Sequence, residues 1–188
     1  MARIVQALSS LVGRADSVLD VGAGDGSLAL ALAERVGAAR VEGVDVLLRP
    51  ARAITVRAYD GKTLPYADGE FSCVVLSDVL HHCEDPRRVL AEALRVASSC
   101  VALKDHFRFG LASQLMLTAL DRAGNAGPGV LVRATYFSPG EWVEMVHAAG
   151  GHVASLSWPL QIHDEPIRRL TRDELQFAAR LEPVARRA

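Results

Sequence analysis

Three glycines at alternate positions follow a short apolar run near the start of the chain, in the stretch VLDVGAGDGS at residues 18–27. The apolar run covers 17–21, and an Ala- and Leu-rich helical pattern covers 27–37. Glycine permits the sharp turn that joins a buried strand to a helix. The stretch therefore predicts a strand–loop–helix unit, with its loop at the carboxyl end of the strand, where open α/β sheets bind ligands.

Strand-like and helical patterns alternate along the rest of the chain. Runs rich in apolar and β-branched residues predict strands at 40–46, 53–60, 100–106 and 152–158, and one more that begins at 71. Helices are predicted at 86–98, 110–124 and 138–151, with Ser138 as N-cap and Pro139 in the first turn, and a loop is predicted at 125–130. This alternation predicts an α/β fold: a doubly wound, Rossmann-like sheet with helices on both faces.

The segment 171–184, TRDELQFAARLEPV, fits two structures. Thr171 and Glu174 form the capping-box pattern of a helix start, whereas Leu175, Phe177, Ala179 and Leu181 alternate as in a strand. We favour the strand.

Composition limits the class of protein. The 188 residues carry 21 basic and 22 acidic side chains and a net charge of −1, so we expect no nucleic-acid partner. Three cysteines without a CxxC pair favour a cytoplasmic protein without disulfides. The amphipathic start predicts a helix over 1–13 instead of a signal peptide, and no apolar run is long enough to span a membrane. We expect one domain over 1–188.

The acids near the glycines indicate the charge of the ligand. A dinucleotide fingerprint would need glycine at position 27, which is Ser27. Asp20 and Asp25 instead bring negative charge to the place where a pyrophosphate would lie. The loop thus suits an ammonium or a sulfonium, and a nicotinamide-dependent reductase becomes the weaker alternative.

Two more acids follow the next predicted strands. Asp45 is placed to accept hydrogen bonds from both hydroxyls of a ribose, and Asp60 to accept one from the exocyclic amine of adenine. Each acid alone could equally cap a helix or a turn. Together with Asp20, they favour one nucleoside ligand.

The chain resembles the class I S-adenosylmethionine-dependent methyltransferases, most closely their small-molecule and ubiquinone-type branch. The resemblance rests on VLDVGAGDGSLA, VEGVDV, YDGKTLPYADGEFSCVVLSDVLHHCEDP and YFSPGEWVEMVHAAGG. It implies a seven-stranded sheet whose last strand is antiparallel and inserted beside the fifth. It also implies methyl transfer from S-adenosyl-L-methionine to a small molecule by in-line displacement, leaving S-adenosyl-L-homocysteine.

The resemblance also implies which residues hold the donor. The methionine part would contact Asp20, Gly22, Ala23, Gly24 and Gly26, the ribose Asp45 and Val46, the adenine Asp60 and Gly61, and the sulfonium would lie near Ser77. The chain departs from the family in having a short N-terminal helix and VASSC, 96–100, in place of a glycine pair.

Methyl transfer depends mainly on alignment of the reactants, and a base helps only a protonated acceptor. Our candidates for that base are His106 and His81, with Asp105 orienting or sharing the proton. We expect His82 to face away from the cavity, because adjacent histidines rarely point the same way. We expect no metal site in 81–85, since consecutive residues on one turn cannot all converge on an ion.

The acceptor side is expected from 1–13, 104–137 and 158–170. Arg122, Asn125, Tyr136 and Trp142 are candidates to line it, although Trp142 fits the core equally well. A tRNA-modifying methyltransferase and a non-catalytic S-adenosylmethionine-binding module are the alternative functions. The sequence leaves open whether oxygen, nitrogen, carbon or sulfur accepts the methyl group.

Overall fold

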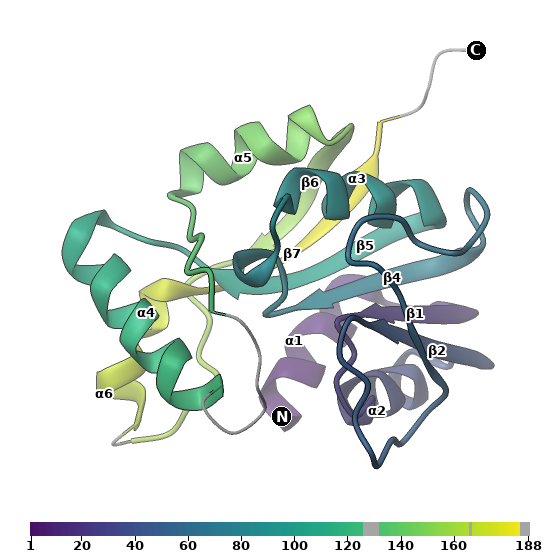
Figure 1. Cartoon of the computed structure of the whole chain (residues 1–188), viewed down its shortest axis with the longest axis horizontal. Helices are drawn as coiled ribbons and strands as arrows, with labels where there is room; N and C mark the ends of the chain where they lie inside the picture. Colours follow the sequence, from purple (N-terminus) through teal and green to yellow (C-terminus); the bar gives the residue numbers. More distant parts are fainter. Residues whose placement is uncertain (126–131, 166, 185–188) are drawn as a thin grey trace.

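The computed structural model describes residues 1–125, 132–165 and 167–184, and a single sheet of seven strands runs through it in the order β3-β2-β1-β4-β5-β7-β6 (Figure 1). The strands are β1 Ser17–Val21, β2 Arg40–Asp45, β3 Val56–Ala58, β4 Phe71–Ser77, β5 Ala97–His106, β6 Gly151–Ser157 and β7 Gln176–Pro183. Neighbours among β1 to β5 pair in parallel, whereas β7 is antiparallel to both β5 and β6. The predicted sheet is confirmed, including the last strand beside the fifth.

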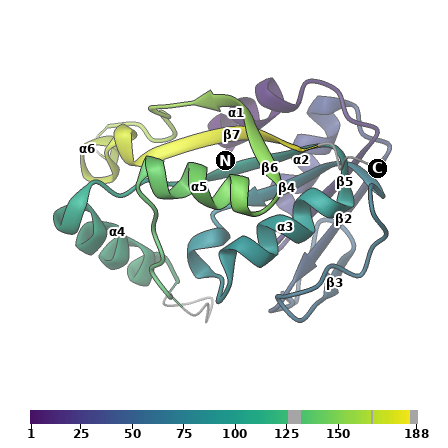
Figure 2. The same cartoon turned by 90° about the horizontal axis from the view of Figure 1, so that it is seen from above.

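Helices cover both faces of this sheet. On one face lie α1 and α2, and on the other lie α3 and α5 (Figures 1 and 2). Beyond the carboxyl ends of β4 and β5 lie α4 and α6 (Figure 1). The helices are α1 Ala2–Val12, α2 Ser27–Val36, α3 Pro86–Val96, α4 Gly110–Asn125, α5 Pro139–Ala148 and α6 Ile167–Thr171, with short 3₁₀ turns η1 Leu80–His82 and η2 Asp173–Leu175.

Apolar side chains of α5 build part of the core. Trp142 is almost fully buried, and its ring meets the ring of Phe177 edge-on at 4.9 Å. Phe177 in turn stacks on Phe107 at 3.8 Å between ring centroids. Trp142 is therefore a core residue and does not line an acceptor site. The predicted start of α5 is confirmed. Ser138 is the N-cap, Pro139 is the first helical residue, and Ser138 and Glu141 form a reciprocal capping box.

Several predicted boundaries differ from the structure. The strand predicted over 53–60 is formed only by Val56–Ala58, and the residues on either side lie in irregular loops. Helix α3 ends at Val96 and β5 begins at once with Ala97, since no glycine separates them. The loop predicted at 125–130 falls mostly outside the described residues.

The ambiguous segment at 171–184 contains both kinds of structure. Thr171 ends the short helix α6, so the capping-box pattern does not start a helix. From Gln176 onward the chain forms β7, because its alternating side chains, including Phe177 and Leu181, are buried beside β5.

The two ends of the described chain are joined through one side chain. Arg180 on β7 donates hydrogen bonds from Nη1 to the backbone oxygens of Leu11 and Val12, the last residues of α1. Leu8 and Val12 on α1 are buried against the sheet. Along the described residues, no helix has the length and hydropathy that crossing a membrane would require.

Candidate active site

The glycine loop is held mainly by the protein itself. Gly22 and Ala23 donate their backbone N–H groups to the carbonyl of Val44, at 2.8 and 3.1 Å. A Cβ atom on Gly22 would lie 2.6 Å from Val79 Cγ2, and one on Gly26 would lie 2.4 Å from Ile54 Cγ1. These two glycines are thus required for packing.

Gly24 differs from its neighbours, because a Cβ atom there would meet open space although its φ is +58°. Its N–H donates to Oδ2 of Asp45 at 2.7 Å, and Leu47 N–H donates to Oδ1 of the same carboxylate at 2.8 Å. Asp45 therefore ties the loop after β1 to the end of β2. At Gly24 the glycine loop therefore offers a ligand open space beside its backbone, while the N–H group of this residue is already hydrogen-bonded to Asp45.

Asp20 is the most unusual acid of this region. Asp20 is only 3% exposed, and none of the described residues donates a hydrogen bond to its carboxylate. Burial and the nearby charge of Asp45 raise the pKa of Asp20 to about 8. A cationic ligand here would compensate two adjacent carboxylates, so this pair suits an ammonium or sulfonium group.

The end of β3 offers a different kind of surface. Oδ1 of Asp60 accepts the N–H groups of Lys62 and Thr63, both at 2.8 Å, which lowers its pKa, while Oδ2 accepts none from the described residues. A Cβ atom on Gly61 would lie 3.2 Å from Val46 Cγ1, and Val46 is 66% exposed. An exposed apolar side chain beside an available carboxylate oxygen can hold a flat ring that bears an amine.

Asp25 has a local structural contact. Its Oδ1 accepts the N–H of Ser27 at 2.9 Å, and this hydrogen bond lowers its pKa. It thus forms an Asx turn just before α2, whose N-cap is Gly26.

A second cluster lies where β4 and β5 end. Nζ of Lys104, almost fully buried, lies 2.6 Å from Oδ1 of Asp78, and Ser77 Oγ lies 3.4 Å from Oδ2. Asp78 has φ +57°, a left-handed conformation that is strained for a side chain other than glycine. Burial acts to raise the pKa of Asp78, but Lys104 and the neighbouring histidines outweigh it, so the pKa is lowered.

His81 and Asp105 form a buried pair within this cluster. Nδ1 of His81 lies 2.5 Å from Oδ1 of Asp105, which also accepts the backbone N–H of His106 at 2.8 Å. Burial acts to lower the pKa of His81, but the charge and hydrogen bond of Asp105 outweigh it and raise the pKa. The sequence-predicted residues 81, 105 and 106 are thus brought together.

His106 is placed differently from His81. Its Nδ1 lies 3.3 Å from Asp78, and its Nε2 contacts no polar partner in the described part of the chain. Burial, and then the charge of Lys104, lower the pKa of His106. Its neutral form is therefore favoured, with Nε2 available as a proton acceptor.

His82 does not face away from this cluster, contrary to the expectation from sequence. Its ring lies 4.2 Å from the ring of His81, and its Nε2 lies 3.4 Å from Oδ1 of Asp121 on α4. Both histidines meet Asp121 because η1 is a tight 3₁₀ turn facing α4. Sequence reasoning missed Asp121 because nothing in the local pattern connects residues 40 positions apart; Tyr136 joins it through a hydrogen bond of 3.1 Å.

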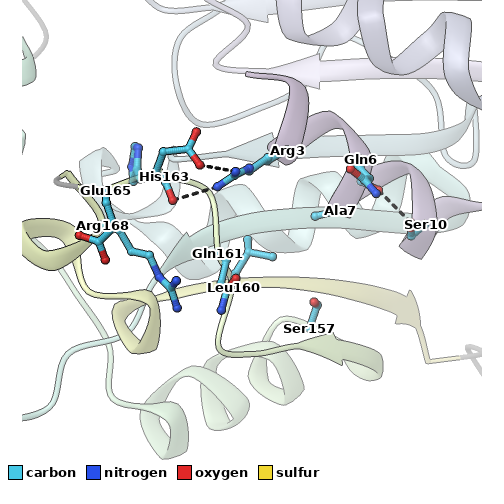
Figure 3. A pocket seen from close by; sticks show the side chains of 11 residues that line it. Arg3, Gln6, Ala7, Ser10, Ser157, Leu160, Gln161, His163, Glu165 and Arg168 are labelled. Carbon is cyan, nitrogen blue, oxygen red and sulfur yellow. Dashed lines mark hydrogen bonds and ion pairs between the residues drawn. The ribbon is translucent and has the colours of Figure 1, made fainter.

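A pocket of about 620 Å³ opens between α1 and the segment after β6 (Figure 3). Two segments expected on the acceptor side, 1–13 and 158–170, meet here, while 104–137 contributes none of the lining residues. Arg3 donates a 2.9 Å hydrogen bond to the carbonyl of His163 (Figure 3) and forms an ion pair with Asp164. Burial, and then the charge of Lys104, lower the pKa of His163, which favours its neutral form.

Comparison with known proteins identifies a methyltransferase domain and structures that share the fold. Residues 19–99 match the methyltransferase-domain family, and no curated protein sequence matches the chain. Among solved structures, the chain is similar to the protein described as a methyltransferase in complex with the Trm112 methyltransferase activator of Haloferax volcanii, with 18% identity, a TM-score of 0.70, and coverage of 95% of this chain and 88% of that one.

Two further structures share the fold. One is 1,6-didemethyltoxoflavin-N1-methyltransferase of Burkholderia thailandensis with bound 1,6-didemethyltoxoflavin and S-adenosylhomocysteine, at 17% identity, TM-score 0.66, and coverage of 96% of this chain and 76% of that one. The other is YcgJ of Bacillus subtilis, at 18% identity, TM-score 0.63, and coverage of 96% and 95%.

Proposed function

We propose that this chain, whose residues 19–99 match the methyltransferase-domain family, is a class I S-adenosylmethionine-dependent methyltransferase that transfers the methyl group to a small-molecule acceptor. The observation that carries the donor site is the buried pair of carboxylates, Asp20 and Asp45, beside a glycine loop. Support for a small acceptor comes from the net charge of −1 and from the Burkholderia relative, whose named acceptor is a small molecule.

The donor would be held along the carboxyl ends of the first three strands. In this proposal, Asp20 faces the charged methionine part, and the loop residues Gly22, Ala23, Gly24 and Gly26 lie along it. Asp45 retains lone pairs for the ribose hydroxyls, because each of its oxygens accepts only one backbone N–H. Val46 and Gly61 would flank the adenine, Oδ2 of Asp60 would accept its amine, and Ser77 would lie near the sulfonium.

His106 is our choice for the general base. Both ring nitrogens of His81 already face carboxylates, at 2.5 Å from Asp105 and 3.8 Å from Asp121. In the described part of the chain, His106 instead directs Nδ1 alone toward carboxylates, at 3.3 Å from Asp78 and 3.6 Å from Asp105, which favours the tautomer with a lone pair on Nε2. We therefore assign the base to His106 and positioning roles to His81 and Asp105.

The proposed transfer step involves one proton and one methyl group. The sulfonium of the bound donor supplies an electrophilic methyl group. As the acceptor atom bonds to the methyl carbon, the carbon–sulfur bond breaks and sulfur keeps the electron pair. Nε2 of His106 would take the proton of a hydroxyl acceptor as its oxygen attacks, or the proton of an ammonium acceptor before the attack, because only the free amine has a lone pair. The carboxylate of Asp78 would stabilise the resulting imidazolium.

The pocket between α1 and 157–168 is our proposed acceptor site. Its volume of about 620 Å³ falls within the range of small-molecule sites, roughly 300–1,000 Å³. Gln6, Gln161 and His163 supply hydrogen-bonding groups along its wall (Figure 3). A polar acceptor of moderate size fits this lining.

Calorimetry tests the donor assignment. We expect S-adenosylmethionine and S-adenosylhomocysteine to bind with one site per chain, and NADPH to show no binding. Binding of NADPH alone would refute the proposal. Methyl-labelled donor then separates acceptor classes: incorporation into small metabolites supports the proposal, whereas incorporation into tRNA alone favours the alternative.

A further inference from the structure

Two histidines and one carboxylate converge at the contact between η1 and α4. Nε2 of His81 lies 3.8 Å from Oδ2 of Asp121, and Nε2 of His82 lies 3.4 Å from Oδ1. One ligand atom from each of the three residues lies within 4.8 Å of the others. We propose that His81, His82 and Asp121 bind a divalent first-row transition-metal ion, with Zn²⁺ as the reference ion.

The spacing of the three residues fits such an ion. Zinc binds imidazole nitrogen and carboxylate oxygen at about 2.0–2.2 Å, which places tetrahedral ligand atoms roughly 3.3–3.5 Å apart. The distance from Nε2 to the Asp121 carboxylate is 3.4 Å for His82 and 3.8 Å for His81, so small side-chain movements bring the ligand atoms to that separation. Three protein ligands of this type leave at least one position open for water or for another molecule.

Hydrogen bonds from neighbouring residues orient His81 and Asp121, as such bonds commonly orient the ligands of a metal ion. Nδ1 of His81 faces Asp105 at 2.5 Å, which directs the lone pair of Nε2 toward Asp121. Asp121 itself accepts hydrogen bonds from Tyr136 Oη at 3.1 Å and from Asn125 Nδ2 at 2.6 Å. The carboxylate–histidine arrangement and the hydrogen-bonded third ligand together favour a metal over a simple ion pair.

A neighbouring group is less suited to a metal. Asp78, Asp105 and His106 also gather around His81, on the side of its Nδ1. The ammonium of Lys104 lies 2.6 Å from Asp78 and would repel a dication, and His81 Nδ1 already shares its proton with Asp105. We therefore assign the ion to the Nε2 side.

The ion would connect two separate parts of the chain. His81 and His82 lie on η1 directly after β4, whereas Asp121 lies on α4, which extends beyond the sheet (Figure 1). Binding would hold α4 in place and stabilise the folded protein. The inference is independent of methyl transfer, since it rests on these contacts alone.

Metal binding to the full chain tests the inference directly. We expect the metal-free protein to take up one equivalent of Zn²⁺ in competition with a chromophoric chelator, and Co²⁺ to give a visible absorption band. Asp121→Asn and His82→Asn should each weaken Zn²⁺ binding by at least about 100-fold, and Asp105→Asn by about 10- to 100-fold. His152→Asn is the matched control, because the side chain of His152 is half-exposed and its Nε2 lies 3.8 Å from Glu182, away from the proposed ligands.

Circular dichroism establishes that each variant is folded, and Zn²⁺ should raise the Tm of the unmodified protein but not that of Asp121→Asn. Absence of stoichiometric binding, or equal affinity in Asp121→Asn, His82→Asn and His152→Asn, would overturn the proposal. Loss of binding in Asp78→Asn with retention in Asp121→Asn would place the ion in the neighbouring group and would also overturn it.

Discussion

The backbone nitrogen of Gly24 lies 2.7 Å from Oδ2 of Asp45, so the acid that ends β2 fixes the loop that follows β1. The same carboxylate also accepts the N–H of Leu47. Asp45 therefore has a structural function in the loop in addition to its proposed contact with the ribose.

Asp45→Ala is expected to abolish donor binding and to lower stability. The change removes the proposed ribose contact and leaves two backbone N–H groups without their acceptor. Each of these groups that stays buried lowers the free energy of unfolding by about 1–3 kcal/mol. Calorimetry with S-adenosylhomocysteine and thermal unfolding measure the two effects. Asp16→Ala is the control, because Asp16 is exposed at the opposite end of β1; unchanged affinity in Asp45→Ala would contradict the assignment.

Donor binding is expected to release a proton at pH 7. The pKa of Asp20 is raised to about 8, so its carboxyl is mostly protonated before binding, and a cationic ligand favours the ionised form. Affinity should increase as the pH rises from about 6 to 8 and then level off. Calorimetry in two buffers with different ionisation enthalpies measures the release, which Asp20→Asn should eliminate; a pH-independent affinity would argue against Asp20 as the cation partner.

The free protein should show the opposite trend in stability. Because the folded pKa of Asp20 is above its unfolded value, the contribution of Asp20 is greatest at low pH and is lost as the pH rises through about 8. Asp20→Asn should therefore raise the Tm at pH 9 more than at pH 5. Equal changes at both pH values would show that Asp20 is not protonated when buried.

Gly26→Ala is expected to be more destabilising than Gly24→Ala. Both positions have positive φ, which costs about 1–2 kcal/mol for alanine, but only the Cβ atom at Gly26 would collide with Ile54, at 2.4 Å. Denaturant unfolding gives the difference. Adding Ile54→Ala should recover part of the loss in Gly26→Ala and none in Gly24→Ala; equal recovery in both would remove the collision as the cause.

His106→Ala should lower turnover by about 10²–10⁴-fold if the acceptor loses a proton, and should leave donor affinity unchanged. Turnover should fall because Nε2 of His106, which contacts no polar partner among the described residues, is the proposed proton acceptor. Donor affinity should stay unchanged because His106 is not among the proposed donor contacts. Single-turnover transfer of a labelled methyl group measures the effect once an acceptor has been found. Normal turnover would exclude His106 as the base.

The sequence predicted the sheet because its strands carry strong local signals. The run at 17–21 and its glycine loop define β1, and the alternation in 176–183 defines β7 once β5 is available as a partner. The boundary between α3 and β5 was not predictable in the same way, because Ala97 suits either structure and only packing on β4 selects the strand.

Contacts between segments that are distant in the chain also could not be predicted from the sequence. Asp20 and Asp45 could be recognised from their positions after strands, but the pairing of Asp121 with two adjacent histidines depends on where α4 lies. Likewise, the sequence did not show that Gly22 and Gly26 are needed for packing against Val79 and Ile54, because these neighbours come from distant segments.

The hydrogen bonds from Arg180 to the end of α1 have a consequence for how the protein is made. Val12 and Arg180 lie 168 positions apart in the sequence, so α1 is synthesised well before the guanidinium that binds its last two carbonyl groups. The hydrogen bonds at the end of α1 can therefore form only after β7 has been synthesised, and the pocket that α1 shares with the segment after β6 only after residues 157–168 have been.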